Sequence, residues 1–222
     1  KINFLYERCI YFYLLFIYFK RCHGAMPEKG VDPINIASHI YISLQEIISR
    51  EISASESAVL TIGKFLGGDA PNVIPDNVVM EGTIRSMSKE TGDFIYERMN
   101  EIVTSTGQLF RGKARLEKIS SVPPLKNDFA LTNEIASYIK DIVGEKSVIQ
   151  YKGGQGMGSE DFAYYSQEVP SVFFMVGAGS SSENPKYGLP MHHPKVEFNE
   201  EVLVTGVAIH AYSAIMWLKN NK

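Results

Sequence analysis

The chain has 222 residues, with 22 Lys and Arg against 25 Asp and Glu, which gives a net charge of −3. This near-neutral charge argues against a nucleic-acid binder, and 45% hydrophobic residues exclude a disordered or collagen-like chain. The two cysteines, Cys9 and Cys22, exclude a disulfide scaffold and a four-cysteine zinc module. They suit a reducing compartment, and we expect a cytoplasmic protein.

The first segment in chain order is an aromatic-rich run that differs from the rest. Residues 10–19 are all apolar or aromatic. This run is shorter than the roughly 20 residues of a membrane-spanning helix, and it lacks the small residues of a signal-peptide cleavage site. Three interpretations stay open: a spurious or truncated segment, which the start at Lys1 favours, a buried strand, or a membrane-directed segment.

The next hundred residues predict helices by three-four apolar spacing and strands by alternation or β-branched runs. Pro33 stands in the first turn of one helix, and Ser88 is a suitable N-cap for another. The predicted elements are a helix at 33–48, strands at 57–66 and 78–87, a helix at 88–109 and a strand at 113–121. One strand in front would complete a split βαβ, ferredoxin-like unit, and residues 10–19 are the only candidate for it.

Pro123-Pro124 marks a boundary, after which strands and helices alternate as in an α/β layer. The predicted elements are a helix at 131–144, a strand at 148–151, a short helix from 159, a strand at 172–176 and a helix at 199–218. The continuous apolar strand 172–176 is typical of a sheet buried on both faces.

Several residues in this half could carry chemistry. His192 and His193 follow a Gly/Ser-rich loop beyond the end of a strand, where an imidazole could bind a divalent metal or simply be exposed. The Gly-rich loop 153–158 lacks the P-loop and Rossmann patterns, so a nucleotide site is not expected. Glu160 either lines a substrate cleft or favours the N-terminus of the short helix. His39 and His210 lie within helices and are expected to be packing or surface residues.

Five motifs taken in order resemble a known family. They are HGAMPEKGVDP, GGDAPNVIPD, EGTIR, GSEDFAYY and MHHPKVEF. The chain from residue 23 to 222 resembles the amidohydrolase branch of the aminoacylase and carboxypeptidase metallopeptidases, peptidase family M20. The resemblance implies an α/β protein with a ferredoxin-like lid or dimerisation domain at 23–121 and the C-terminal part of a catalytic domain at 122–222. Residues 1–22 form a separate atypical segment, either spurious or the first strand of the lid.

The family's chemistry gives roles to five residues here. Members hydrolyse the amide bond of N-acyl amino acids or peptides with two divalent metal ions, zinc or manganese, and a glutamate base. The resemblance makes His192 a metal ligand, although Met191 stands where Leu is usual. His23 would reach the partner subunit's active site and help to hold the oxyanion. Asn72 and Arg85 would contact the substrate carboxylate, and Glu160 would line the site. His193 falls on a variable position.

The family's remaining metal ligands and its base lie upstream of the lid, and no such pattern occurs here. Before His23 only Glu7, Cys9 and Cys22 could serve as ligands. We therefore expect a truncated member that does not hold the metal pair and is inactive as this chain alone. The alternative function is a non-catalytic dimerisation module that forms a homodimer through the lid. Membrane attachment is not expected, although an N-terminal anchor is the third alternative.

Overall fold

The computed structural model describes residues 2–4, 9–149 and 158–221. The chain divides into two compact units, and each is described by itself. The first unit contains residues 2–4, 125–149 and 164–221, and the second contains residues 9–124 and 158–163. We call residues 9–122 of the second unit the lid.

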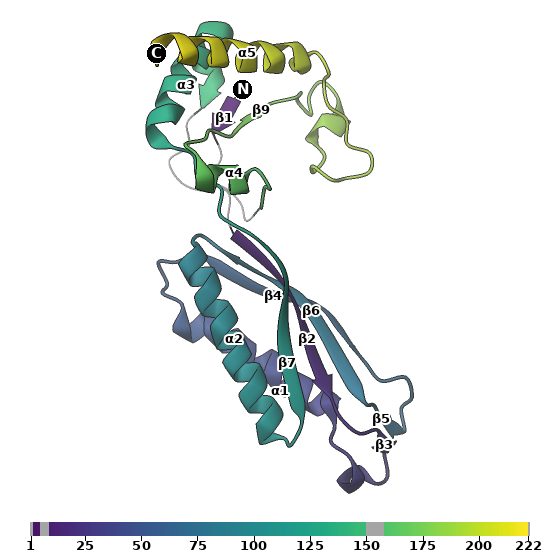
Figure 1. Cartoon of the computed structure of the whole chain (residues 1–222). Helices are drawn as coiled ribbons and strands as arrows, with labels where there is room; N and C mark the ends of the chain where they lie inside the picture. Colours follow the sequence, from purple (N-terminus) through teal and green to yellow (C-terminus); the bar gives the residue numbers. More distant parts are fainter. Residues whose placement is uncertain (1, 5–8, 150–157, 222) are drawn as a thin grey trace. The chain divides into compact units, whose positions relative to one another are not determined.

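The lid is a four-stranded antiparallel sheet with two helices on one face (Figure 1). The strand order is β4-β6-β2-β7. The elements are β2 (Cys9–Tyr18), α1 (Pro33–Glu46), β4 (Ala58–Gly67), β6 (Asn77–Ser86), α2 (Lys89–Leu109) and β7 (Lys113–Val122). This β-α-β-β-α-β order confirms the predicted ferredoxin-like fold.

The N-terminal aromatic run forms β2, a central strand of the sheet. Its odd-numbered side chains, such as Tyr13, Leu15 and Ile17, are at most 3% exposed and pack under the helices, while Phe12 and Tyr18 face the open side. Of the three interpretations of this run, the structure therefore confirms the buried strand. The expected lid boundary at residue 23 omits this strand. The lid must begin before residue 23, because β2 lies between β6 and β7 in its sheet.

Both lid helices begin where the sequence predicts. The Asp32 carboxylate accepts hydrogen bonds from the amides of Ile34 and Asn35, and Pro33 occupies the first turn of α1. The Ser88 hydroxyl accepts from the Thr91 amide at the start of α2, at 3.1 Å. A π-helix, Ile47–Glu51, follows α1 directly.

A polar cluster joins β2 to α2 beside the core. The Tyr11 hydroxyl donates to Asp93 Oδ1 at 2.8 Å, and Lys89 Nζ donates to Asp93 Oδ2 at 2.5 Å. The lysine holds the pKa of the Asp93 carboxyl below its ordinary value, and burial raises the pKa of Tyr11. Next to this cluster Cys9 Sγ lies 2.8 Å from the Ser86 hydroxyl, and burial raises the pKa of the thiol. Cys9 is thus a core residue rather than a candidate ligand.

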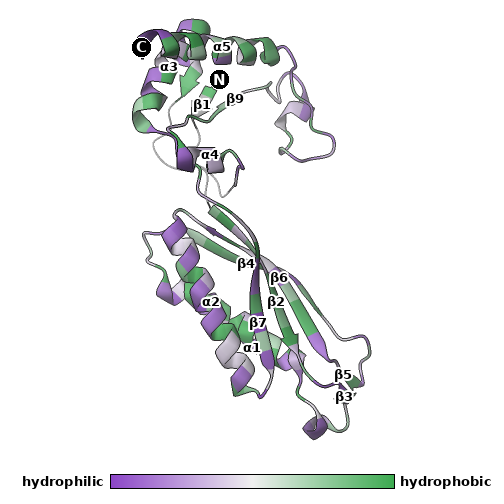
Figure 2. Cartoon of the chain, viewed as in Figure 1, coloured by the Kyte–Doolittle hydropathy of each residue, from purple (hydrophilic) through white to green (hydrophobic). Residues whose placement is uncertain are grey.

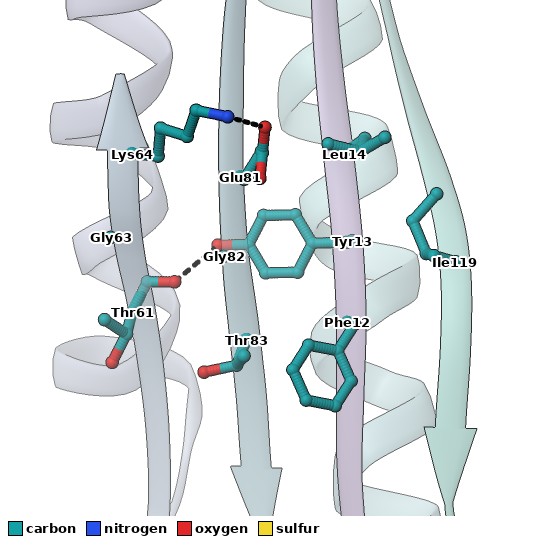
Figure 3. A pocket seen from close by; sticks show the side chains of 10 residues that line it. All are labelled: Phe12, Tyr13, Leu14, Thr61, Gly63, Lys64, Glu81, Gly82, Thr83 and Ile119. Carbon is teal, nitrogen blue, oxygen red and sulfur yellow. Dashed lines mark hydrogen bonds and ion pairs between the residues drawn. The ribbon is translucent and has the colours of Figure 1, made fainter. Parts of the chain in front are cut away.

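Gly82 and Gly63 lie in the middle of the sheet and differ in the space around them. The Tyr13 ring lies over Gly82 and its hydroxyl donates to the Thr61 carbonyl at 3.0 Å, as Figure 3 shows. A Cβ at Gly82 would lie 2.1 Å from Thr61 O and 2.4 Å from the Tyr13 hydroxyl, whereas one at Gly63 would meet nothing within 4 Å. Only the first glycine is therefore required by packing.

The first unit has a small mixed sheet of order β8-β1-β9 with helices beside it. Its strands are β8 (Val148–Ile149), β1 (Ile2–Phe4) and β9 (Phe174–Val176), and its helices are α3 (Phe129–Val143), α4 (Ala163–Glu168) and α5 (Val202–Asn220). Three 3-10 turns occur in the part of the chain that the structure describes: Pro27–Lys29, Glu145–Ser147 and Pro185–Gly188. β1 pairs parallel with β8 and antiparallel with β9. The prediction that strand 172–176 is buried on both faces is wrong, because Met175 of β9 is 38% exposed.

α5 is an apolar helix that contacts the unit along a narrow stripe. Ile209 and Ser213 are buried, while Leu203, Val207 and Leu218 are more than 60% exposed. Figure 2 shows its ribbon largely in the green of apolar residues, in contrast to α2. Among the described residues it is the one helix long and apolar enough to span a membrane by length and composition. Tyr212 and Asn220 bond it to α3, through Asp141 at 3.2 Å and Tyr138 at 2.8 Å.

Candidate functional site

Two predicted site residues, His23 and Asn72, come together at one end of the lid. β3 (Cys22–His23) lies beside β5 (Val73–Ile74) at this end (Figure 1). The two strands pair antiparallel, and His23 stands opposite Val73. The Gly24 amide donates to the Asn72 carbonyl at 2.8 Å. We call His23, Gly24, Ala25 and Asn72 the lid tip. The side chains of His23 and Asn72 are both exposed there, so they are available to a ligand.

Gly24 permits this close approach of the two segments. A Cβ at Gly24 would lie 2.9 Å from the Asn72 carbonyl oxygen, closer than side-chain carbons come to such an atom. The adjoining ion pair of Arg21 and Asp69, at 3.3 Å, also links the two segments. Sequence reasoning missed this pair, because nothing local connects residues 48 positions apart before the pairing of β3 and β5 is known.

Arg85 lies away from the tip, near the far end of β6. It pairs with Ile10 of β2 and Val59 of β4, and it is half-buried on the face opposite the helices, as the alternation predicts. β6 begins at Asn77, so Arg85 stands eight residues, roughly 26 Å, further along the strand. Within one lid, Asn72 and Arg85 are therefore too far apart to bind the same small carboxylate.

Glu160 precedes the short helix α4. Its Oε1 accepts a hydrogen bond from the Phe162 amide at 3.3 Å, and its carbonyl accepts from the Ala163 amide at 3.1 Å. The carboxylate thus caps the turn into α4, which was one of the two predicted roles. Of the Gly-rich loop 153–158 in front of it, residues 153–157 lie outside the described residues.

His192 occupies an exposed loop in a strained backbone conformation. Its φ is +97°, one of two positive values for non-glycine residues in the described chain, the other being Arg111. Such values cost free energy and are found at functional sites. The neighbouring His193 is also exposed, and its Nδ1 accepts a hydrogen bond from the Lys195 amide at 3.1 Å. The strain singles out His192, not His193, as the unusual residue of the loop.

The metal donors that the residues offer do not fit a two-metal centre. Across residues 2–4, 9–149 and 158–221, no three His, Cys, Asp or Glu side chains are grouped so that they could hold a metal ion. His192 is therefore a single candidate ligand, and no metal-assisted step is assigned to this chain. Glu7, the remaining candidate donor before the lid, lies outside the described residues.

His39 and His210, which were expected to be packing or surface residues, both pack against an aromatic ring. The His39 ring stacks on Phe110 with centroids 4.6 Å apart, and His210 stacks on Phe174 at 5.3 Å. Both histidines are exposed on their helices, which agrees with the predicted packing or surface role.

Comparisons with known proteins bear on both units. Residues 12–108 match the peptidase dimerisation domain of family M20. The chain is 33% identical over 201 residues to the IAA-amino acid hydrolase ILR1-like 2 of Arabidopsis thaliana, covering 89% of this chain and 44% of the relative. It is 32% identical over 203 residues to the N-acetyl-L-cysteine deacetylase of Bacillus subtilis, covering 91% and 46%.

A solved structure also matches the whole chain. The YXEP protein of Bacillus subtilis, described as a dinuclear metal-binding peptidase of family M20, gives a TM-score of 0.71 at 26% identity, covering 99% of this chain and 52% of that one. The ferredoxin-like lid and the small α/β unit are thus those of a metallopeptidase-type chain. The chain belongs to peptidase family M20, and it spans about half the length of the curated relatives it matches.

Proposed function

We propose that this chain provides the lid and the C-terminal catalytic segment of a cytoplasmic M20 amidohydrolase that cleaves the amide bond of N-acyl amino acids. The observation that carries the proposal is the lid tip, where His23 and Asn72 come together on a ferredoxin-like sheet. The relatives named as an IAA-amino acid hydrolase and an N-acetyl-L-cysteine deacetylase support the same substrate class.

Each candidate residue has a defined task in this proposal. The His23 imidazole donates a hydrogen bond to the oxygen on which negative charge develops. Asn72 contacts the substrate through its carboxamide, and the Arg85 guanidinium holds a carboxylate by paired hydrogen bonds. Since Arg85 lies near the end of β6 that is far from the lid tip and Asn72 lies at the tip, the two residues act on different ligands or from different protomers. His192 contributes one ligand to a divalent metal centre.

We further propose that the 222-residue chain is inactive on its own. One described ligand candidate cannot hold two metal ions, and the metal pair is what polarises the scissile carbonyl in such a centre. The test is hydrolysis of N-acetyl-L-cysteine and indole-acetyl amino acids with added zinc or manganese, with the Bacillus deacetylase as the positive control. Circular dichroism confirms that the tested chain is folded.

We expect no turnover, and fewer than two tightly bound metal ions per chain in equilibrium dialysis. Weak metal binding, if seen, should disappear in His192→Ala and persist in the matched variant His193→Ala. Turnover by the folded chain, or two stoichiometric metal ions, would contradict the inactivity.

A second candidate function is homodimerisation through one edge of the lid. The edge strand β7 carries four charged side chains that discourage pairing, at positions 113, 115, 117 and 118. The opposite edge strand, β4, carries one charged side chain, Lys64, which forms an ion pair with Glu81. Beside it α1 exposes Tyr41 and Ile42, and Tyr41 packs edge-on against Phe65. A second copy placed against β4 and α1 would cover these apolar side chains.

Sedimentation of the full chain tests this interface with a matched pair of substitutions. Ile42 on α1 is 66% exposed and Ile119 on β7 is 55% exposed. We expect a dimer that Ile42→Glu dissociates and Ile119→Glu leaves intact. A chain that stays monomeric at high concentration, or a dimer lost only with Ile119→Glu, would contradict the proposed interface.

A further inference from the structure

The two ring nitrogens of His23 have different surroundings. Nδ1 accepts a hydrogen bond from the backbone amide of Ala25, two residues further on, at 3.1 Å. A neutral imidazole has one N–H, and a ring nitrogen that accepts a hydrogen bond carries no proton. The proton of neutral His23 is therefore on Nε2, on the far side of the ring from the backbone.

The turn that supplies this amide is held by its neighbours on both sides. The Gly24 amide donates to the Asn72 carbonyl at 2.8 Å, and the Met26 amide donates to the His23 carbonyl at 2.8 Å. The backbone amides of residues 24, 25 and 26 thus each donate a hydrogen bond to a defined acceptor. Because Gly24 has no room for a side chain against Asn72, the turn that aims the Ala25 amide at the ring depends on this glycine.

We propose that the Ala25 amide is a positioning group that fixes His23 as the Nε2–H tautomer, so that the lid tip presents a neutral hydrogen-bond donor to an oxygen ligand. The inference rests on the proposed function for the identity of that oxygen, which is the carbonyl oxygen of the scissile amide. A fixed N–H donor suits developing negative charge there, since no reorientation is needed. In this tautomer His23 moves no proton, because its lone pair is occupied by Ala25.

His193 shows the same arrangement and gives an internal comparison. Its Nδ1 accepts from the Lys195 amide, also two residues on, at 3.1 Å. A neutral His193 therefore also carries its proton on Nε2 and has no free lone pair for a metal ion. His192, next to it, makes no such bond among the described residues, which agrees with its assignment as the candidate ligand of the pair.

Nuclear magnetic resonance of the ¹⁵N-labelled full chain tests the inference directly. The spectra are recorded at about pH 8.5, and the signals of the neutral rings are compared. We expect a through-hydrogen-bond coupling between the Ala25 amide nitrogen and Nδ1 of His23, and ring correlations that place the proton on Nε2. His23→Gln assigns the signals.

Two variants separate the role of the amide from that of the side chain at position 25. Ala25→Pro removes the donor, and we expect the coupling to vanish and the His23 tautomers to relax towards the mixture of an unrestrained histidine. Ala25→Gly keeps the donor and should keep the Nε2–H form. The His193 signals should not change in either variant.

The inference is overturned if the wild-type coupling is absent, if the proton is on Nδ1, or if the tautomer ratio is the same in the wild type and Ala25→Pro. The wild-type measurement decides even if the proline variant disturbs the lid tip. None of these readouts involves hydrolysis, so a failure of the proposed amidohydrolase function would leave the result unaffected.

Discussion

Neighbouring leucines on β2 test whether the N-terminal run is the central strand of the lid. Leu15 is 0% exposed and stands between Met80 and Leu116, both buried, in the register of the sheet. Leu14 lies on the open face and is half-buried. The two residues share one strand and one side-chain chemistry, so Leu15→Ala and Leu14→Ala differ mainly in the burial they remove.

The expected costs follow from that burial. Truncating a fully buried leucine loses its transfer free energy and leaves a cavity, so Leu15→Ala should lower the free energy of unfolding by about 3 kcal/mol. Leu14→Ala removes a partly solvated side chain and should cost about 1 kcal/mol. With a urea slope of about 2 kcal/mol per molar, the two midpoints should fall by roughly 1.5 M and 0.5 M.

The assay is urea unfolding of the full chain followed by far-ultraviolet circular dichroism. The single tryptophan, Trp217, lies in α5 of the first unit, so its fluorescence follows that unit separately. Equal costs for the two leucines, or no cost for Leu15→Ala, would refute the assignment of residues 9–18 to the core and return the segment to the spurious interpretation.

Three further predictions concern the lid. Gly82→Ala should destabilise it by about 1–3 kcal/mol in thermal unfolding, because the new methyl overlaps a carbonyl and a hydroxyl, whereas Gly63→Ala should be neutral or slightly stabilising. Asp93→Asn should cost less than about 1 kcal/mol at pH 7, since the carboxyl is a third exposed. The pKa of Asp93 is lowered in the folded state, so the extra stability of the wild type over Asp93→Asn is present above the ordinary value of 3.8. It is lost as the pH falls from there through the lower folded-state pKa. Iodoacetamide should alkylate the half-buried Cys22 much faster than Cys9, which is 1% exposed with a raised pKa.

Each of these has a contrary result. Equal melting temperatures for the two glycine variants would contradict the contact over Gly82. A stability difference for Asp93→Asn that persists unchanged at pH 2 would show that charge is not its origin. Faster modification of Cys9 in peptide mass spectra would place that thiol outside the core.

Local patterns were sufficient to predict most of the lid. Pro33 in a first turn, the N-cap Ser88 and the alternation in 78–87 set element boundaries within a residue or two of those observed. The topology followed from counting, because α-β-β-α-β lacks one strand and the run at 10–19 was the one segment able to supply it.

Non-local pairing is what the sequence could not give. β3 and β5 have two residues each, too few for any periodicity, yet their pairing creates the lid tip. The separation of Asn72 from Arg85 likewise depends on how far β6 extends, although both residues were identified from motifs. The exposure of Met175 in β9 depends on which segments cover the faces of the small sheet, and an apolar run of five residues looks the same whether its faces are covered or not.

The pairing of β1 has a consequence for how the polypeptide is made. Ile2 pairs with Val148 and Val176, so the ribosome must deliver the entire lid before the first strand finds either partner. At about 5–20 residues per second β1 waits on the order of ten to thirty seconds. During that interval the lid, whose own strands end at Val122, can fold while β1 has neither neighbour, and the small sheet is then assembled after the lid, from strands that precede and follow the lid in the chain.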